Sequence, residues 1–171
     1  ADQYEDDKHV FQKYFEEIEI GDTVVTRKHT VLEADIVNFA NVSGDNFYAH
    51  VDATSLDDTI FEQNVAHGYW VLAKAAGLFV DGKKGPVLLN YGLEDCRFTK
   101  PVYPGMTLGV RFTAKEKISQ EKKVAAEGEV LAKGMGIKKG IVKFLVDVYD
   151  ETGETVALAT ILTMIKFKNQ D

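Results

Sequence analysis

The distribution of apolar and polar residues along the chain predicts one dominant helix followed by a run of strands. From Val65 to Val80 apolar side chains occupy most positions, and Lys74 is the single charged residue. A helix that is apolar on nearly all sides must be enclosed by other parts of the fold. Further along, β-branched and apolar residues separated by turn sequences predict strands at residues 87–99, 107–118, 124–131, 141–149 and 155–167.

The first third of the chain contains shorter elements. Residues 23–30 are rich in Thr and Val, which is typical of a strand. Residues 32–42 predict a short helix, with Glu33 and Asp35 in the first turn, where the helix dipole favours acidic side chains. This helix should end near Gly44.

The segments around these elements are irregular. Residues 43–58 are dense in Gly, Asp, Asn and Thr and show no period, so we expect an irregular connection. Residues 1–13 are polar and acidic, which predicts a loosely ordered lead before a single folded domain at residues 14–171.

This order of elements indicates an α+β domain in which an antiparallel sheet wraps around a long central helix. A doubly wound sheet is excluded because helices do not alternate with strands. The glycines of Gly134–Gly140 resemble a dinucleotide-binding loop, but the last gap is one residue too long and a strand follows instead of a helix. We interpret this segment as a hairpin loop.

Composition narrows the function classes. The chain has 171 residues, 45% of them apolar and 27% charged, which is typical of one folded domain. The single cysteine, Cys96, and the lack of any Cys/His cluster with zinc-ligand spacing argue against a disulfide or a structural metal and favour a reducing compartment. No secretory signal and no run of 18 apolar residues is present, so we expect a cytoplasmic protein without a membrane partner.

The formal net charge of −7 argues against general nucleic-acid binding. Its distribution is uneven, because residues 83–171 carry 15 basic and 11 acidic side chains. This excess could meet a small phosphorylated ligand, with Lys83, Lys84 and Arg97 as candidates, or it could be a solvated face of the sheet.

Two polar segments could carry chemistry. Asp45 and His50 lie five residues apart in the irregular segment, where they can converge on one water molecule and share general acid and base roles. Asp45 could instead cap a turn, with His50 an inert loop residue. His67 and Gly68 begin the long helix, where free N–H groups can hold an oxyanion. Gly68 could instead serve only for close packing against a strand.

Three segments resemble the MaoC-like dehydratase family, the (R)-specific enoyl-CoA hydratases of hot-dog fold. They are residues 39–50, 66–68 and 101–105. The usual family motif reads Gly-Asp-x-Asn-Pro-x-His, and here Phe47 and Tyr48 occupy the Asn and Pro places.

That departure, together with residues 65–69, 75–80 and 85–94, is similar to one branch of the family. The branch comprises the C-terminal hydratase domains of bifunctional oxepin-CoA hydrolase/aldehyde dehydrogenases in phenylacetate degradation. No aldehyde dehydrogenase sequence is present in these 171 residues. We therefore expect either an excised domain or a stand-alone relative.

The resemblance implies a single hot-dog domain that acts on a CoA thioester and needs no cofactor other than the coenzyme A of its substrate. It implies that Asp45 and His50 are the catalytic pair and that the Gly68 N–H is the oxyanion donor. The substrate pocket is then lined by Phe47, Tyr48, His67 and Tyr69. It also implies a homodimer or higher homo-oligomer, with an aldehyde dehydrogenase as a further partner.

The reaction we expect is the addition of water at the β-carbon of an α,β-unsaturated CoA thioester, in the form of hydrolytic ring opening of oxepin-CoA. Two aromatic rings beside the catalytic pair would suit a flat, seven-membered ring. An alternative is an (R)-specific enoyl-CoA hydratase for straight-chain substrates. An alternative of another class is a catalytically silent acyl-CoA-binding or scaffold domain.

Overall fold

The structure, a computed structural model, describes residues 8–171. The strands are β1 Thr23–Val25, β2 His29–Thr30, β3 Val87–Phe98, β4 Thr107–Ser119, β5 Lys139–Tyr149 and β6 Thr155–Lys166. The helices are α1 Glu33–Ser43, α2 Tyr48–Val51 and α3 Gly68–Phe79, with 3-10 turns at Val10–Gln12, Phe15–Glu17 and Ala53–Ser55. Within residues 8–171, no helix combines the length and the apolar character needed to cross a membrane.

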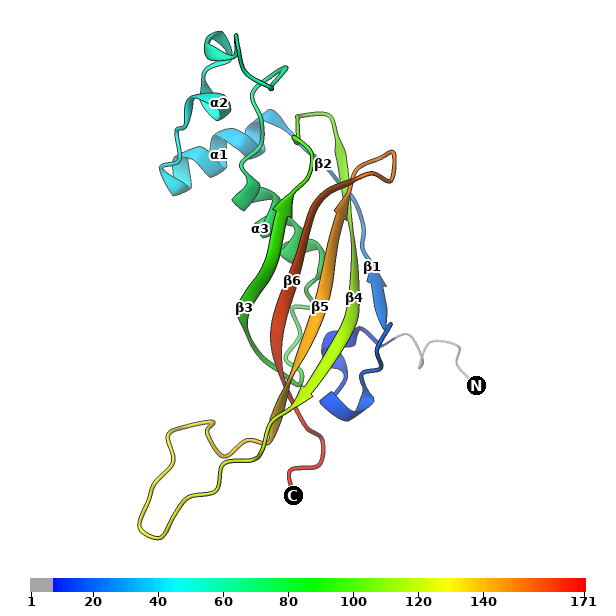
Figure 1. Ribbon diagram of the computed structural model, residues 1–171, viewed down its shortest axis with the longest axis vertical. Helices are drawn as coiled ribbons and strands as arrows, with labels where there is room; N and C mark the ends of the chain where they lie inside the picture. The colour runs from blue at the N-terminus through cyan, green and yellow to red at the C-terminus, as the bar shows by residue number, and fades with distance from the viewer. Residues whose placement is uncertain (1–7) are drawn as a thin grey trace.

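The strands form one antiparallel sheet in the order β1-β4-β5-β6-β3, and β2 also pairs with β4. Helix α3 runs along one face of this sheet (Figure 1). The predicted α+β architecture with a sheet around a central helix is confirmed. The predicted strand at residues 23–30 is instead two short strands, β1 and β2, which both pair with β4.

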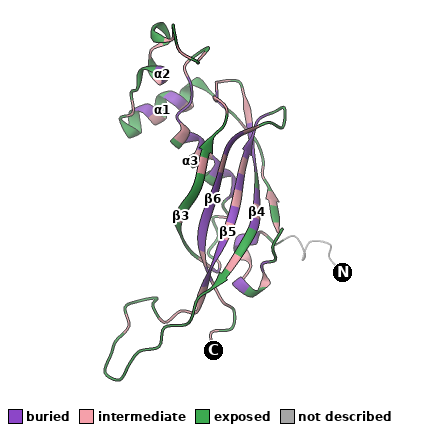
Figure 2. Ribbon diagram, in the orientation of Figure 1, coloured by how far each residue is buried: buried purple, intermediate pink, exposed green. Residues whose placement is uncertain are grey.

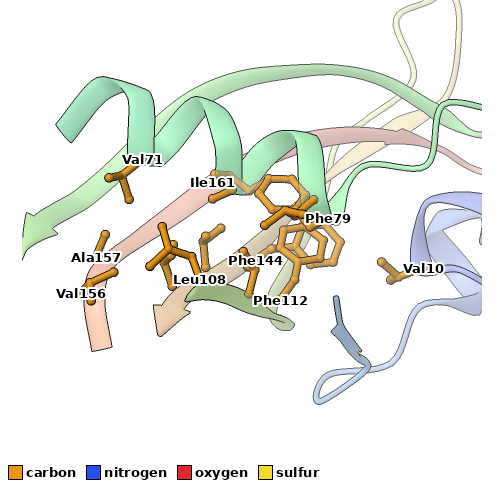
Figure 3. Packing of buried hydrophobic residues seen from close by; sticks show 14 of the residues in the cluster. Val10, Val71, Phe79, Leu108, Phe112, Phe144, Val156, Ala157 and Ile161 are labelled. Atoms are coloured by element: carbon orange, nitrogen blue, oxygen red, sulfur yellow. The ribbon is translucent and has the colours of Figure 1, made fainter. Parts of the chain in front are cut away.

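The core lies between α3 and the sheet (Figure 3). Phe79 of α3 stacks on Phe112 of β4 with ring centroids 4.3 Å apart, and Phe112 stacks on Phe144 of β5 at 4.4 Å. Nearly parallel planes in both pairs allow three rings to fill the space between helix and sheet. This cluster anchors the C-terminal end of α3.

The predicted loose lead is wrong for its described part, residues 8–13. Val10 and Phe11 are buried in the core, and the Phe11 ring meets the Phe112 ring edge-on at 5.4 Å. His9 accepts a hydrogen bond from the Phe11 N–H through Nδ1, at 3.0 Å, and its Nε2 lies 2.9 Å from the Phe79 carbonyl oxygen. Val10 and Phe11 are the only apolar pair in an acidic segment and show no helical or strand period, so the sequence pattern did not predict that they would be buried. Residues 1–7 of the lead lie outside the described residues.

The predicted strand at residues 124–131 is also wrong. Residues 120–138 form a long loop that extends beyond the sheet (Figure 1), and Val124 and Val130 are exposed. Strands β4 and β5 on either side of this loop already pair with each other, up to Ser119 opposite Gly140. The loop therefore closes a hairpin and meets no free strand edge with which it could pair.

Helix α3 is only half enclosed. Trp70, Val71 and Leu78 are buried against the sheet, whereas Tyr69 is 74% exposed and Ala73 is also exposed. Figure 2 shows that β3, the edge strand, is also largely exposed, unlike the buried central strands. The expectation of an enclosed helix is therefore not met by the described residues of one chain, among which an apolar helix face lies beside a sheet edge that pairs with no further strand.

Candidate functional site

The site is built at the N-terminal end of α3, where the segment after α1 folds back over the helix. Helix α1 begins with the Leu32 N–H donating to the Asp35 carboxylate at 2.8 Å. It ends at Gly44, whose φ of 76° is a left-handed conformation that glycine adopts without strain. The predicted helix and its end are confirmed. The reversal at Gly44 points Asp45 toward α3.

Asp45 and His50 converge, as predicted. Residues 43–58 are less irregular than expected, because His50 lies on the single-turn helix α2. The Asp45 carboxylate, the His50 imidazole and the His67 imidazole each place a polar atom within 4.8 Å of the other two. Asp45 also accepts a hydrogen bond from the Phe47 N–H at 3.3 Å, so the turn that the sequence allowed as an alternative exists alongside the convergence.

One hydrogen bond sets the tautomer that the His50 ring adopts when it is neutral. Its Nδ1 lies 2.6 Å from the carbonyl oxygen of Val65. A carbonyl oxygen only accepts, so Nδ1 carries the proton and the neutral ring keeps a lone pair on Nε2. His50 therefore offers Nε2 as a base, and one of its ring nitrogens lies within 4.8 Å of a carboxylate oxygen of Asp45.

His67 contacts both members of this pair. It is 1% exposed, its Nε2 donates to the Asp45 carbonyl oxygen at 2.9 Å, and its ring stacks on that of His50 at 3.7 Å. Its Nδ1 is buried and has no hydrogen-bond partner among the described residues. The ring thus fixes the backbone at Asp45 and one face of His50.

A metal ion fits these residues poorly. The His50 and His67 rings are stacked, with centroids 3.7 Å and planes 23° apart, so a single ion could lie near the plane of only one of them. A metal ion needs ring nitrogens that converge on one point about 2.0–2.1 Å away. The arrangement suits a shared water molecule better than chelation.

Gly68 begins α3 in close contact with the edge strand. A Cβ atom at this position would lie 2.7 Å from the Phe98 ring, so the close-packing role that the sequence allowed is real. The N–H groups of the first helical turn have no partner within the helix. Gly68 can therefore pack closely on Phe98 and still offer its N–H to an oxyanion.

A cavity of about 540 Å³ opens beside these groups. Asp45, His50, His67, Gly68 and Tyr69 all line it. The remaining walls are mainly apolar and come from the ends of β3 and β6 and from the loops at residues 60–66 and 99–102. One small polar cluster in an apolar cavity is typical of a site for a small molecule.

Two predicted pocket residues lie elsewhere. Phe47 and Tyr48 do not line this cavity, and each is more than 40% exposed. Their rings contact each other at 4.5 Å, and Phe47 also meets the His50 ring edge-on at 5.9 Å. The expectation that they form the wall of the pocket is wrong within one chain, because the short helix α2 turns them outward.

One polar cluster at the cavity wall was not anticipated by the sequence analysis. Lys100 lines the cavity and donates to Asp150 at 2.7 Å and to Glu154 at 2.9 Å. The Lys100 ammonium and the hydroxyl and N–H of Thr152 hold the pKa of the buried Asp150 carboxyl well below its usual range. These contacts span about 50 residues, and only the hairpin turn at residues 150–153 could be anticipated.

Comparisons with known proteins agree with this geometry. Residues 15–134 match the family described as MaoC like domain. Protein MaoC of Klebsiella aerogenes is 54% identical over 113 residues, which is 66% of this chain and 34% of that protein. The chain thus spans about a third of that relative. An (R)-specific enoyl-CoA hydratase of Rhodospirillum rubrum is 29% identical over 64% of this chain and 74% of that protein.

Solved structures show the same fold. A protein of Archaeoglobus described as a monoamine oxidase regulatory protein superimposes with a TM-score of 0.79 at 28% identity, over 92% of this chain and 96% of that one. A Mycobacterium tuberculosis protein described as having a double hotdog fold superimposes with a TM-score of 0.73 at 16% identity, over 93% and 46% of the two chains. The sheet around α3 is therefore a hot-dog domain.

Proposed function

The chain belongs to the MaoC-like hydratase and dehydratase family, and on that basis we propose that it adds water across the α,β double bond of a CoA thioester. One observation carries the proposal. Asp45, His50 with its free Nε2, and the start of α3 at Gly68 all border the same apolar cavity. The same chemistry in reverse would dehydrate a 3-hydroxyacyl thioester.

In the proposed reaction the Gly68 N–H donates to the thioester oxygen, which draws electrons from the double bond and makes the β-carbon electrophilic. A water held between Asp45 and His50 gives one proton to His50 Nε2 while its oxygen bonds to the β-carbon. The electron pair of the double bond moves toward the thioester oxygen. The proton taken up by His50 passes through the Asp45 carboxylate to the α-carbon, so both residues return to their starting states and the net change is addition of water.

Removal of either member of the pair tests this assignment. We expect Asp45→Asn and His50→Ala each to lower kcat for crotonyl-CoA hydration by about a hundredfold or more, which is the usual contribution of a general acid or base. Circular dichroism and the urea midpoint should remain close to those of the parent protein. Near-parental turnover by either folded variant would remove the pair from the mechanism.

Ring opening of a cyclic, oxygen-bearing enoyl-CoA is the finer proposal. Addition of water at a β-carbon that bears the ring oxygen gives a hemiketal, whose collapse yields a ketone and an enol. The support is the sequence resemblance at Phe47 and Tyr48, which flank His50 without lining the cavity. An aldehyde dehydrogenase partner stays a prediction from that resemblance.

The kinetic comparison of two substrates decides between the finer proposal and a straight-chain hydratase. We expect a higher kcat/KM for oxepin-CoA than for crotonyl-CoA. Shape discrimination in an apolar pocket is limited to about 1–3 kcal/mol per poorly fitted group, so measurable hydration of crotonyl-CoA should remain. Equal values, or a preference for crotonyl-CoA, would leave the (R)-specific hydratase, the activity for which the Rhodospirillum relative is named.

We also propose that the chain forms a homodimer through β3. The outer edge of this strand has no partner strand within residues 8–171, and the strand carries exposed apolar side chains at Leu89, Tyr91 and Leu93 beside the exposed face of α3. An exposed apolar edge strand favours association with another strand. A monomer mass of 19.0 kDa by light scattering at micromolar concentration would contradict this.

A further inference from the structure

A groove of about 580 Å³ lies between helices α1 and α2 and the segment that follows them. Apolar side chains line much of it, among them Ile36 and Val37 of α1 and Val51 of α2. His50 lines both this groove and the cavity of the candidate active site. The groove is therefore a second concave surface on the segment that carries the proposed catalytic histidine, and the proposed reaction does not use it.

The segment that forms the groove, residues 33–66, is an acidic lobe. It contains seven Asp and Glu residues and no Lys or Arg, so its formal charge equals the net charge of −7 of the whole chain. Asp35 pairs with His29, but the other six acids form no ion pair in the part of the chain that the structure describes. Glu33 and Glu62 are exposed and line the groove. An acidic rim around an apolar floor favours a partner with cationic and apolar side chains.

The opposite end of the molecule carries such a segment (Figure 1). Residues 115–139, the arm, comprise the end of β4, the long loop and the first residue of β5. They contain seven Lys and four Glu residues. Val124 is 77% exposed, Val130 is 93% exposed, and Lys122 and Lys123 directly precede Val124. The arm therefore presents lysines beside apolar side chains that its own subunit leaves uncovered.

The arm and the groove of one chain are too far apart to meet. Strand β4 runs from Thr107, which pairs with Thr30 just before the acidic lobe, to Ser119 on the arm. Its twelve residue steps span about 40 Å at strand geometry. A segment that fills the groove therefore comes from another molecule. The arm of a second copy fits, because it brings lysines to acids that lack ion pairs and valines to an apolar floor.

We propose that the arm of one copy docks in the groove of the acidic lobe of a second copy. Val124 packs on Val37 and Val51, and Lys122 and Lys123 lie against the acidic rim. Because Val51 belongs to α2, the docked arm also holds the helix that carries the proposed catalytic histidine. The groove and the arm are different surfaces, so the contact joins copies head to tail. Neither surface includes β3, and no substrate takes part, so the inference is independent of the proposed reaction.

Disulfide formation tests the contact directly. The double variant Val51→Cys/Val124→Cys is made in a Cys96→Ser background, so that the chain has no other thiol. Within one chain the two positions are too far apart for a disulfide, which needs Cα atoms within about 7 Å of each other. We expect mild oxidation to give covalently linked copies on a non-reducing gel, and neither single cysteine variant to do so.

A matched control is Val25→Cys/Val124→Cys in the same background. Val25 lies on β1, outside the acidic lobe, and it is 63% exposed, whereas Val51 is 48% exposed. A thiol at position 25 is therefore at least as accessible, and random collisions would link this variant equally well. We expect at least about tenfold less linked product from the control, because disulfides form only between thiols that the complex holds close together.

Charge reversal then tests what holds the two surfaces together. Lys122→Glu/Lys123→Glu, added to the double-cysteine variant, should slow linking by about tenfold at low salt, because like charges then face each other. Glu33→Lys/Glu62→Lys should slow linking to a similar extent. Combining the two reversals restores opposite charges, so linking should return to near the rate of the double-cysteine variant. Losses that simply add in the combined variant would show that these lysines and acids do not meet.

Several results would overturn the inference: no linked product, equal linking of the control, or linking that charge reversal does not change. An anionic membrane is the competing occupant for a basic arm with exposed valines. Co-sedimentation of the parental protein with phosphatidylserine/phosphatidylcholine vesicles, lost in Lys122→Glu/Lys123→Glu, would assign the arm to lipid and also overturn the inference. We expect no such binding, because the acidic lobe and the net charge of −7 repel an anionic surface. The turnover of Asp45→Asn bears only on the proposed function, since linking is measured without substrate.

Discussion

The two ends of helix α3 differ in the contacts that hold them. At its C-terminal end, Phe79 packs on Phe112 and Phe144, and this stack joins helix to sheet without polar contacts. At its N-terminal end, Gly68 lines a cavity together with Asp45 and His50, and hydrogen bonds between residues far apart in the sequence hold these groups. Stability is concentrated at one end and chemistry at the other, so changes at the two ends should have separable effects.

The largest expected effect on stability comes from the aromatic stack. Phe112 is fully buried between two other rings, so Phe112→Ala removes a large apolar side chain and leaves a cavity. We expect a loss of about 3–5 kcal/mol in the free energy of unfolding, measured by urea denaturation. The kcat of the protein that remains folded at low temperature should stay within a few-fold of the parental value. A large fall in kcat without loss of stability would break the comparison.

The opposite end should respond mainly in activity. Gly68→Ala places a Cβ about 2.7 Å from the Phe98 ring, which must move. Phe98 is 51% exposed, so its ring can shift, and we expect a stability cost of only about 1 kcal/mol. Because Phe98 lines the cavity and Gly68 begins the helix, kcat should fall by roughly tenfold from the misplaced geometry.

A double-mutant cycle checks that this cost arises from the contact. Phe98→Ala removes the ring, so Gly68→Ala added to it should cost less stability than it does in the parent, with a coupling that approaches the full 1 kcal/mol or so. Urea midpoints of the four proteins give the coupling. Additive costs would show that the close approach of Gly68 to Phe98 is not what restricts this position.

The contrast between the two ends also explains what the sequence could predict. Helix α3 and strands β3 to β6 follow from local patterns, because their apolar residues repeat with the period of the element they form. The apolar pattern at residues 124–131 resembles a strand equally well, but it has no free edge to pair with. The local apolar pattern thus predicts an element correctly where the buried residues follow the period of that element. It fails where the availability of a partner strand determines whether a strand forms.

The site is less predictable because its geometry depends on distant contacts. Residue types alone singled out Asp45 and His50, and the family resemblance supplied their roles. The hydrogen bond from His67 to the Asp45 carbonyl and the contact of Lys100 with Asp150 join residues 22 and 50 positions apart. No periodic signal reports such pairs, and none indicates that Phe47 and Tyr48 face outward.

The pH dependence of stability should also differ between the two ends of α3. We expect this effect to be smaller than those of Phe112→Ala and Gly68→Ala. The network of Lys100, Asp150 and Glu154 borders the cavity, whereas the aromatic stack contains no titratable group. The pKa of Asp150 is held below its usual range by Lys100 and Thr152, so it is lower in the folded protein than the unfolded value of about 3.9. Stability from this carboxylate is therefore fully present above about pH 5 and is lost as the pH falls through the folded pKa.

Asp150→Asn isolates that contribution. An asparagine at position 150 keeps an oxygen that can accept the hydrogen bond from the Thr152 hydroxyl, but it cannot ionise. Between pH 7 and pH 3 the urea midpoint of the parental protein should fall further than that of Asp150→Asn. Other carboxyl groups whose pKa lies below its ordinary value, such as those of Asp22 and Asp35, are common to both proteins and cancel in the difference. Parallel curves would show that Lys100 and Asp150 contribute no pH-dependent stability. The wall of the active cavity would then be held as the far end of α3 is held, by apolar packing alone.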